Sequence, residues 1–309
     1  MRVLVTGATG FVGTALVERM ILERRHIVRS ATRRGGVRAE GDEVQADLDA
    51  ATNWREALIE VDAVVHLAAR VHVMRDTATD PLQEFRRVNV AGTLNLAQQS
   101  AAAGVRRFVY LSSAKVHGES GTFRETDSPA PEDAYGISKY EAEVGLRHIG
   151  SATGMEVVII RPPLVYGPRV RANMQALVRA VARGIPLPLG AVHNRRSLVS
   201  LDNLVDFILT CLEHPAAADD TFLVSDGEDL STTDLIRRLA RAMGRPARLI
   251  PVPALVLLAA ATLLGQRAAA RRLLGTLQVD TSKARQQLAW SPPVPVDEAL
   301  RRMVTAYRK

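Results

Sequence analysis

The stretch "RVLVTGATGFVG", residues 2–13, joins an apolar run to a helical pattern through a turn that contains Gly7, Gly10 and Gly13. Glycines at such a junction let the backbone approach a ligand closely, because they carry no Cβ atom. The first amides of a helix are unpaired and partly positive, so a turn of this kind can cradle a phosphate. The pattern is typical of a dinucleotide-binding turn in a parallel α/β domain, with an ordinary tight strand–helix turn as the alternative.

The rest of the first half repeats this alternation of short apolar runs and helical patterns. Repeated strand–helix units predict an α/β fold with a doubly wound parallel (Rossmann) sheet and helices on both faces. The expected strands are 3–5, 27–31, 44–46, 63–67, 108–111 and 157–160, and the expected helices are 12–23, 54–60, 82–103 and 135–152.

The rhythm changes after Arg161, where prolines cluster and most later segments have helical spacing. We expect a dinucleotide-binding domain over 1–165, with a returning segment at about 196–225 that contains short apolar runs. A smaller, mostly helical substrate lobe is expected over 166–195 and 226–309. Ligands of open α/β sheets bind at the carboxyl ends of the strands, so this lobe is expected to cap that edge.

Composition bounds the class of protein. The chain has 309 residues, of which 47% are hydrophobic and 24% charged, as in soluble globular proteins. Cys211 is the single cysteine, which excludes a disulfide framework or a thiolate zinc site within one chain and fits a reducing cytoplasm. The histidines have no H-E-x-x-H spacing, so no metal is expected. The strand begins at once after Arg2, so we expect no signal peptide and a cytoplasmic location.

The longest apolar stretch, 254–264, is about half the ~20 residues that a membrane-spanning helix needs. It predicts a buried or half-buried helix and no transmembrane segment. A contact with a membrane surface is the alternative, because Arg267, Arg271 and Arg272 follow it. The net charge of +7 comes from arginines spread along the chain without interleaved aromatics, so an anionic small substrate is expected rather than nucleic acid.

The stretch "DAYGISKYEAE" places Tyr135 and Lys139 on one face of a helix, because residues i and i+4 are neighbours there. A lysine ammonium beside a phenol is expected to lower the tyrosine pKa from about 10, which makes a general acid/base near neutral pH. Ser112 and Ser113 follow the expected strand 108–111, where a hydroxyl can hold a substrate oxygen. Serines are also common turn formers, but the three features together form a specific pattern.

With these motifs the chain resembles the extended short-chain dehydrogenases/reductases that act on nucleotide sugars, the NAD-dependent epimerase/dehydratase family. The resemblance covers nearly the whole chain. It rests on "TGATGFVG" at 6–13, "ADL" at 46–48, "HLAA" at 66–69, "NVAGTLNL" at 89–96, "RPPLVYGP" at 161–168, "RSLVSLDN" at 196–203 and "VDTSKARQQLAWSPP" at 279–293.

The resemblance implies a catalytic set of Ser113, Tyr135 and Lys139, with Ser113 chosen over Ser112 by counting back from "VHG". Hydride would move between the nicotinamide and a sugar carbon, Tyr135 would carry the proton of the sugar oxygen, and Lys139 would also hold the nicotinamide ribose. The implied cofactor-binding residues are Thr6, Gly7, Gly10, Phe11, Val12, Gly13, Thr32, Arg33, Arg34, Asp47, Leu48, Leu67, Ala68, Ala69, Tyr135, Lys139 and Pro162. The implied substrate-binding residues are Arg70, Ser113, Lys115, Asn173, Arg196 and Arg272, of which Arg196 would pair with the diphosphate.

Two departures from the family pattern narrow the function. The family's dehydratases carry an acidic pair directly after the catalytic serine or threonine, where this chain has Ala114 and Lys115. A 4,6-dehydratase is therefore not expected, and Lys115 is either a solvated loop residue or a substrate contact. The carboxylate that selects NAD is also missing after the second strand, where Thr32 precedes two arginines. NADP is therefore preferred, with NAD as the alternative, unless these are exposed loop arginines.

Three segments look closest to a subgroup found with bacterial O-antigen and lipopolysaccharide synthesis: "RPPLVYGPRVRANM" at 161–174, "GIPLPLG" at 184–190 and "FLVSDGEDLSTTDL" at 222–235. We predict reduction of the 4-keto group of a UDP-4-keto-6-deoxy-N-acetylhexosamine, giving a product of the UDP-N-acetylquinovosamine type. A UDP-sugar 4-epimerase is the next alternative, and a non-catalytic NADP-binding regulator the third. A homodimer is expected, paired through 82–103 and the Tyr135 helix, since both carry apolar residues beyond one stripe: Leu94, Leu96, Ala97, Ile137, Val144 and Leu146.

Overall fold

The computed structural model describes residues 1–33, 42–71, 80–170 and 172–308. Within them, seven parallel strands form one sheet in the order β10-β7-β5-β4-β1-β2-β3. The strand order reverses between β1 and β4, which creates the crevice where doubly wound folds bind ligands. The predicted fold class is confirmed. The strands are β1 (Arg2–Thr6), β2 (Ile27–Thr32), β3 (Asp42–Gln45), β4 (Ala63–His66), β5 (Arg107–Leu111), β7 (Glu156–Arg161) and β10 (Thr221–Leu223).

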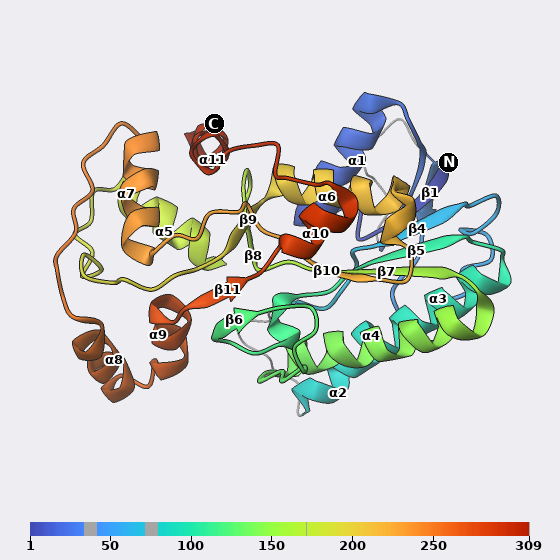
Figure 1. Cartoon of the computed structure of the whole chain (residues 1–309), viewed down its shortest axis with the longest axis horizontal. Helices are drawn as coiled ribbons and strands as arrows, with labels where there is room; N and C mark the ends of the chain where they lie inside the picture. Colours follow the sequence, from blue (N-terminus) through green and yellow to red (C-terminus); the bar gives the residue numbers. More distant parts are fainter. Residues whose placement is uncertain (34–41, 72–79, 171, 309) are drawn as a thin grey trace.

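Helices cover both faces of the sheet (Figure 1). On one face lie α1 (Phe11–Glu23) and α6 (Leu201–Glu213). On the other lie α3 (Thr93–Ala102) and α4 (Ala134–Thr153), side by side. Successive β1 side chains alternate between the two cores, since Val3 and Val5 pack under α1 and α6 while Leu4 faces α3 and α4.

Two expected helices differ in the structure. Residues 54–60 form turns instead of a helix, although Trp54 and Leu58 are buried. The Trp54 amide donates to Gln99 Oε1 at 2.7 Å, so a tertiary contact holds a segment too short for a stable helix. The expected helix 82–103 is divided into α2 (Pro81–Phe85), a π-helical segment η1 (Arg86–Gly92) and α3.

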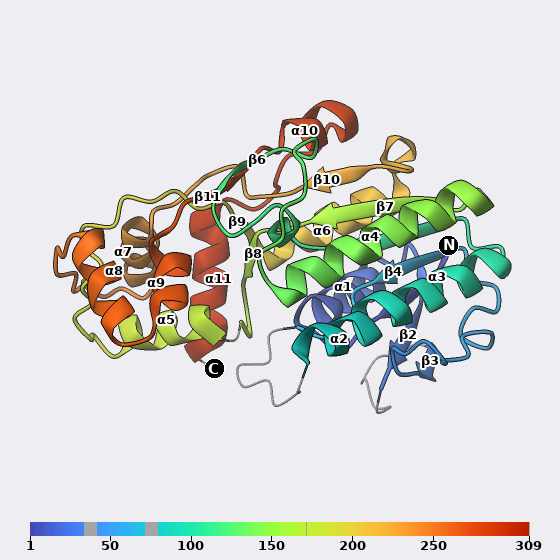
Figure 2. The ribbon, with the colours of Figure 1, turned by 90° about the horizontal axis from the view of Figure 1, so that it is seen from below.

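The second lobe lies beyond the carboxyl ends of the strands (Figure 2). Its core contains Tyr166, Val178, Leu239 and Leu300. Its helices are α5 (Ala172–Ala182), α7 (Thr232–Ala242), α8 (Ala254–Leu263), α9 (Arg267–Leu274) and α11 (Val296–Arg308).

The last segments do not all belong to this lobe. Helix α10 (Ser282–Leu288) was expected in the substrate lobe, but Ala284, Leu288 and Trp290 pack into the core under α1 and α6. The Trp290 indole N–H donates to Asp206 Oδ2 at 2.8 Å and fixes this return. Short parallel pairs join distant segments: β8 (Leu164–Tyr166) with β9 (Leu198–Ser200), and β6 (Gly121–Phe123) with β11 (Leu277–Val279).

The surface proposed for the homodimer is less apolar than expected. Leu96, Ala97 and Leu146 are buried inside the chain, because α3 and α4 pack on the sheet. Leu94 lies against Gly145 of α4, where an added Cβ would come within 2.6 Å of its Cδ2. Only Val144, 49% exposed, is an exposed large apolar side chain among the residues chosen for this interface. The homodimer stays a prediction with a smaller apolar basis.

The apolar stretch 254–264 agrees with the half-buried form of the expectation, because Leu257 packs on the lobe core while Leu255 and Leu263 are exposed. It forms α8, and no residue of that helix is buried. Among the described residues, no helix combines the length and apolar character that a bilayer span requires.

Candidate active site

The glycine turn closes tightly between β1 and α1. Gly7 has φ 68°, and the Gly10 amide donates to the Gly7 carbonyl at 2.8 Å. A Cβ on Gly7 would lie 2.7 Å from the Ala68 nitrogen, and one on Gly13 would lie 2.1 Å from the Gly7 oxygen. Larger residues are therefore excluded, and Gly10 is the N-cap of α1, which has no side-chain cap. These features suit the approach of a phosphate to the helix N-terminus.

The end of β4 is tied to this turn by buried polar groups. Thr6 Oγ1 lies 2.6 Å from His66 Nδ1, and His66 Nε2 lies 2.9 Å from Thr93 Oγ1. The Ala68 amide donates to Thr6 Oγ1 at 3.3 Å. Burial, followed by the charge of Lys139, lowers the pKa of His66 to about 3, so this imidazole is neutral and structural.

The two serines after β5 have different environments. Ser112 is buried, and its hydroxyl donates to Glu143 Oε1 at 2.6 Å. Ser113 caps a short 3₁₀ helix, η2 (Ala114–Val116), accepts from the Lys115 amide at 3.2 Å and lines the large cavity described below. Ser113 is thus the serine that a substrate can reach, which agrees with its selection over Ser112.

Tyr135 and Lys139 lie near the start of α4, whose N-cap is Asp133. Tyr135 lines the same cavity as Ser113. Lys139 is 2% exposed, and its Nζ lies 4.2 Å from the centre of the Tyr110 ring. Burial lowers the pKa of Lys139 to about 7, while Glu143 opposes that shift.

The expectation that Lys139 lowers the tyrosine pKa is wrong for this structure. Burial, followed by the charge of Asp133, raises the pKa of Tyr135 above its usual value. Desolvation disfavours the phenolate of Tyr135. Burial also disfavours the ammonium of Lys139, so the positive charge of Lys139 offsets the rise in the tyrosine pKa only a little. Without a bound cofactor these contacts favour the phenol, which is the form that donates a proton.

A buried charged network lies beneath these residues. Glu143, fully buried on α4, accepts from Ser112 and from Arg161 Nε at 3.0 Å. Arg161 Nη1 lies 2.8 Å from His117 Nε2, and the pKa of His117 is lowered to about 4, first by burial and then by Arg161. The network fixes the strand ends before Ser113 and Pro162. Sequence reasoning missed its roles, although Glu143 lies at i+4 from Lys139 and Arg161 opens a quoted motif.

Lys115 is neither solvated nor free. Its ammonium donates to Glu119 Oε1 at 2.7 Å and to Asp133 Oδ2 at 2.5 Å. Asp133 also accepts from the Gly136 amide at 2.7 Å as the cap of α4. Lys115 thus links the loop after Ser113 to the start of the Tyr135 helix, and it lines the cavity from that position.

A large cavity joins the glycine turn to the second lobe. Its volume of about 2330 Å³ exceeds that of ordinary single-ligand sites, about 300–1,000 Å³, and leaves room for a dinucleotide beside a nucleotide sugar. The predicted cofactor and catalytic residues that line it are Gly10, Phe11, Arg33, Ser113, Tyr135 and Pro162. The predicted substrate residues that line it are Lys115, Asn173, Arg196 and Arg272.

The lobe side of the cavity carries two arginines. Arg196 Nη1 donates to the carbonyls of Arg272, at 2.7 Å, and Gly275, at 3.1 Å. These backbone contacts hold Arg196 in place without neutralising its charge, while burial lowers its pKa. Arg70 differs from the expectation, because its guanidinium lies 5.5 Å from the centre of the Phe85 ring and it is not among the described residues that line the cavity.

Comparison with known proteins identifies this arrangement. The model of the NAD dependent epimerase/dehydratase family matches residues 3–225. The chain belongs to this family. It is an enzyme of the NAD-dependent nucleotide-sugar type, and its sheet, glycine turn and Tyr-x-x-x-Lys helix are those of a short-chain dehydrogenase/reductase.

Three similar proteins place the chain within the epimerase/dehydratase family. A Vibrio cholerae protein named UDP-glucose 4-epimerase is 46% identical, over 99% of this chain and 95% of that protein. An Escherichia coli O157:H7 protein named N-acetyl-alpha-D-glucosaminyl-diphospho-ditrans,octacis-undecaprenol 4-epimerase is 31% identical, over 81% of this chain and 76% of its own length. The solved structure of MoeE5 with UDP-glucose and NAD has a TM-score of 0.81 at 25% identity, over 100% of this chain and 99% of that one.

The adenine end of the epimerase/dehydratase site contains two opposing features. Arg33 is exposed and lines the cavity, while Arg34 lies outside the described residues. Thr32 Oγ1 donates to Glu43 Oε1 at 2.7 Å, so β3 supplies a carboxylate that sequence reasoning missed. A guanidinium suits a 2′-phosphate, whereas a carboxylate suits a free 2′-hydroxyl. The family is NAD-dependent, and the NADP preference stays a prediction.

The remaining predicted cofactor residues support the turn and the adjacent loops. Leu48 is buried, and a Cβ on Gly92 would lie 2.9 Å from its Cγ. The Leu48 amide donates to Asp47 Oδ1 at 2.9 Å. Val12 and Leu67 pack against the core under α1 and α6, and Ala69 follows β4 in a half-buried loop.

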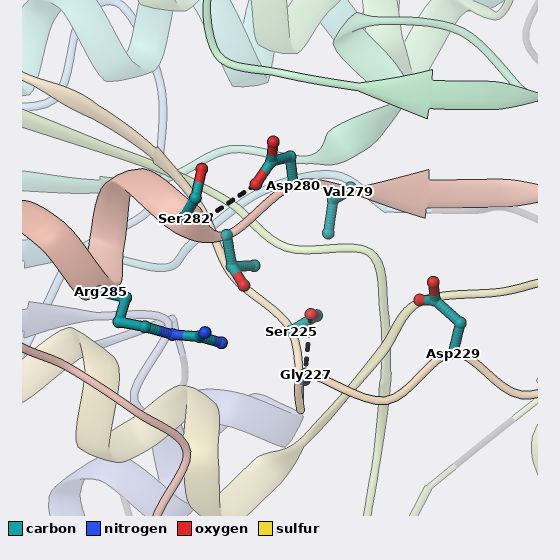
Figure 3. A pocket seen from close by; sticks show the side chains of 8 residues that line it. Ser225, Gly227, Asp229, Val279, Asp280, Ser282 and Arg285 are labelled. Carbon is teal, nitrogen blue, oxygen red and sulfur yellow. Dashed lines mark hydrogen bonds between the residues drawn. The ribbon is translucent and has the colours of Figure 1, made fainter.

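A second, smaller cavity of about 220 Å³ shares no lining residue with the large one (Figure 3). Its polar groups pair locally: the Ser282 amide donates to Asp280 Oδ1 at 2.9 Å, and the Gly227 amide donates to Ser225 Oγ at 3.2 Å. We assign no ligand to it.

Proposed function

We propose that this enzyme interconverts the C4 epimers of a UDP-hexose or a UDP-N-acetylhexosamine. The observation that carries the proposal is the exposure of Ser113 and Tyr135 in one cavity that the glycine turn and Arg196 also border. The 46% identity to a protein named UDP-glucose 4-epimerase supports epimerisation over the reduction that the sequence alone favours.

The residues present fit a dinucleotide. A Cβ on Gly10 would approach the Gly7 oxygen to 3.0 Å, so the turn keeps a surface free of side chains at the amino end of α1. Gly10 and Phe11 would hold the pyrophosphate, and Lys139 the nicotinamide ribose. When bound, the cofactor supplies an acceptor and donor of hydride at the sugar carbon.

In the proposed reaction Tyr135 carries the proton of the sugar oxygen at C4. Oxidation would require Tyr135 as the phenolate, a form that the positive charge of an oxidised nicotinamide beside it would favour. The proton of the sugar hydroxyl would then pass to the Tyr135 oxygen and a hydride from C4 to the cofactor, which would leave a 4-ketose. Return of hydride to the opposite face of C4, with the proton from Tyr135, gives the epimer. Ser113 donates a hydrogen bond to the same sugar oxygen, and Arg196 pairs with the diphosphate.

The second candidate is reduction of a UDP-4-keto-6-deoxy-N-acetylhexosamine. The end of β2 favours this reaction, because Thr32 and the exposed Arg33 stand where NAD-selective relatives place a carboxylate and net reduction uses NADPH.

The O157:H7 relative, by its name, acts on an N-acetylglucosaminyl group carried by undecaprenol diphosphate. This supports an N-acetylated sugar and a place in O-antigen or lipopolysaccharide synthesis.

One pair of incubations separates the candidates. In the first, UDP-glucose or UDP-N-acetylglucosamine is incubated with the enzyme and a trace of NAD⁺. In the second, the UDP-4-keto-6-deoxy-N-acetylhexosamine is incubated with the enzyme and NADPH, and the products of both are identified by NMR. Appearance of the galacto epimer, without net cofactor consumption, supports the epimerase. Stoichiometric NADPH consumption with the 4-keto-6-deoxy sugar, and no epimer, supports the reductase. Absence of turnover in both, with tight NADP binding, would favour a non-catalytic regulator.

A further inference from the structure

Helix α8 is apolar on the face that it turns to solvent. Its partly covered positions follow helical spacing at Ala254, Leu257, Leu258 and Ala261, and Leu257 packs on the core of the second lobe. The opposite face is also apolar: the exposed fraction is 80% for Leu255, 55% for Val256 and 89% for Leu263. A helix that needs only to cover the lobe core would carry polar residues there.

The exposed apolar surface continues into the next helix. Leu264 is 76% exposed and Leu273 is 40% exposed, and α8 packs against α9 at the outer end of the lobe (Figure 2). We call residues 254–274 the α8–α9 hairpin. Such a cluster of exposed large apolar side chains is typical of an interaction site, not of scattered surface residues.

The charged side chains of the segment 235–279, which contains the hairpin, have one sign. Three of its arginines pair with carboxylates from outside the segment: Arg272 with Glu119 at 3.8 Å, Arg237 with Asp234, and Arg238 with Glu228. No aspartate, glutamate or lysine occurs from residue 235 to residue 279, although the segment contains eight arginines. Among the described residues no carboxylate pairs with Arg248, Arg267 or Arg271. The arginines of the segment are Arg237, Arg238, Arg241, Arg245, Arg248, Arg267, Arg271 and Arg272.

The exposed leucines and the arginines of the hairpin together indicate one kind of binding partner. Exposed leucines beside unpaired arginines match an anionic lipid surface, which offers apolar chains below a negative headgroup layer. A second copy paired through the same surface would bring these arginines against their own symmetry mates. Nucleic acid fits poorly, because the segment contains no aromatic residue for stacking. Helix α8, ten residues long, is too short to cross a bilayer and would lie in its surface.

We propose that the α8–α9 hairpin docks this enzyme on the surface of membranes that contain anionic lipid. Arg272 and Leu273, at the end of α9, also line the large cavity. Docking therefore places one wall of the active-site cavity beside the bilayer. The docking surface does not depend on which reaction the site performs.

The test is co-sedimentation of the full chain with vesicles of phosphatidylcholine alone and of phosphatidylcholine mixed with phosphatidylglycerol. We expect about tenfold tighter binding to the mixed vesicles, weakened by salt. Leu255→Gln/Leu263→Gln abolishes this binding, and Arg267→Gln/Arg271→Gln weakens it about tenfold. These side chains are exposed and outside the catalytic set, so turnover of soluble substrate stays unchanged in both variants.

Matched controls lie on the other domain. Leu22→Gln/Ile59→Gln replaces side chains that are 80% and 57% exposed, and Arg55→Gln/Arg106→Gln removes two exposed charges. Both controls bind vesicles like the wild type. Equal binding to both kinds of vesicle, or unchanged binding by Leu255→Gln/Leu263→Gln, would overturn the proposal. A further outcome would also overturn the proposal: the wild type does not bind vesicles and sediments as a dimer, and Leu255→Gln/Leu263→Gln sediments as a monomer. The hairpin would then pair two copies of the chain.

Discussion

The guanidinium of Arg161 donates to the carboxylate of Glu143 from both Nε and Nη2, and both side chains are buried. Arg161 ends β7 and Glu143 lies on α4, so this pair joins the strand that leads into the second lobe to the helix that carries Tyr135. Ser112, which precedes Ser113, donates to the same carboxylate. The alignment of Ser113, Tyr135 and Pro162 therefore depends on one buried charge.

Glu143→Gln is expected to destabilise the fold. It leaves the buried Arg161 without its counter-charge, and breaking a buried pair costs about 3–5 kcal/mol of unfolding free energy. Urea unfolding measures the change. The matched control is Glu141→Gln, on the same helix as Glu143, which alters a partly exposed pair with Arg86 of η1 and should cost far less. Equal losses of unfolding free energy in the two variants would show that the buried pair stabilises the fold no more than the pair of Glu141 with Arg86.

Tyr135→Phe is expected to lower kcat by about 10²–10⁴ while cofactor binding stays nearly intact, because only the proton-transfer group is removed. Steady-state kinetics and cofactor titration measure the two effects. Tyr140→Phe, five residues further along α4, is the control for loss of a helix hydroxyl. Wild-type turnover in Tyr135→Phe would remove this residue from the mechanism.

Acid should destabilise the fold through His66. Its folded pKa of about 3 lies below the unfolded value near 6.5, so the unfolded chain binds more protons between these limits. Stability is therefore lost as the pH falls from about 6.5 toward 3. From pH 6 to pH 5 this histidine contributes a loss of about 1 kcal/mol. We expect His66→Gln to lose less stability than the wild type over that interval in urea unfolding, with exposed His193→Gln as the control. The same slope in wild type and His66→Gln would contradict the assignment.

Arg196→Ala is expected to raise the KM for the nucleotide sugar about tenfold or more, since it removes a charge-assisted contact with the diphosphate. Arg195→Ala is a close control, because Arg195 is the exposed neighbour and does not line the cavity. An unchanged KM in Arg196→Ala, or an equal rise in Arg195→Ala, refutes the substrate role.

The cofactor preference can be measured directly. If Arg33 faces the ribose, as the reductase candidate requires, NADPH binds more tightly than NADH and Arg33→Ala reduces the difference, because a guanidinium pairs with a 2′-phosphate. Calorimetry on both cofactors provides the affinities, and Arg55→Ala controls for net charge. If Glu43 faces the ribose instead, NADH binds more tightly and Glu43→Gln weakens it.

Local patterns in the sequence were sufficient for much of the fold and part of the site. Val3, Leu4 and Val5 predict a strand because a fully buried parallel strand favours an unbroken apolar run. The neighbouring β4 follows the same rule, whereas β2 contains Arg29 and Ser30. The i, i+4 spacing of Tyr135 and Lys139 is a property of one helix and needs no tertiary information. The glycine turn is local only in part: Gly13 closes on the Gly7 carbonyl within the turn, whereas the close approach of Ala68 to Gly7 depends on the position of β4.

Other features were decided only by the tertiary structure. Lys115 pairs with Asp133, and Arg161 with Glu143, across 18 residues of sequence in each case, and sheet order brings these partners together. The segment that begins at the buried Trp54 forms turns instead of a helix, and the side-chain oxygen of Gln99, 45 residues away, accepts a hydrogen bond from the Trp54 backbone amide. The pKa values of Tyr135 and Lys139 follow from desolvation, a property of the packed interior that neighbouring residues in sequence do not determine. The same holds for α8: its sequence is that of a buried helix, and only the packing of the lobe leaves its leucines in solvent.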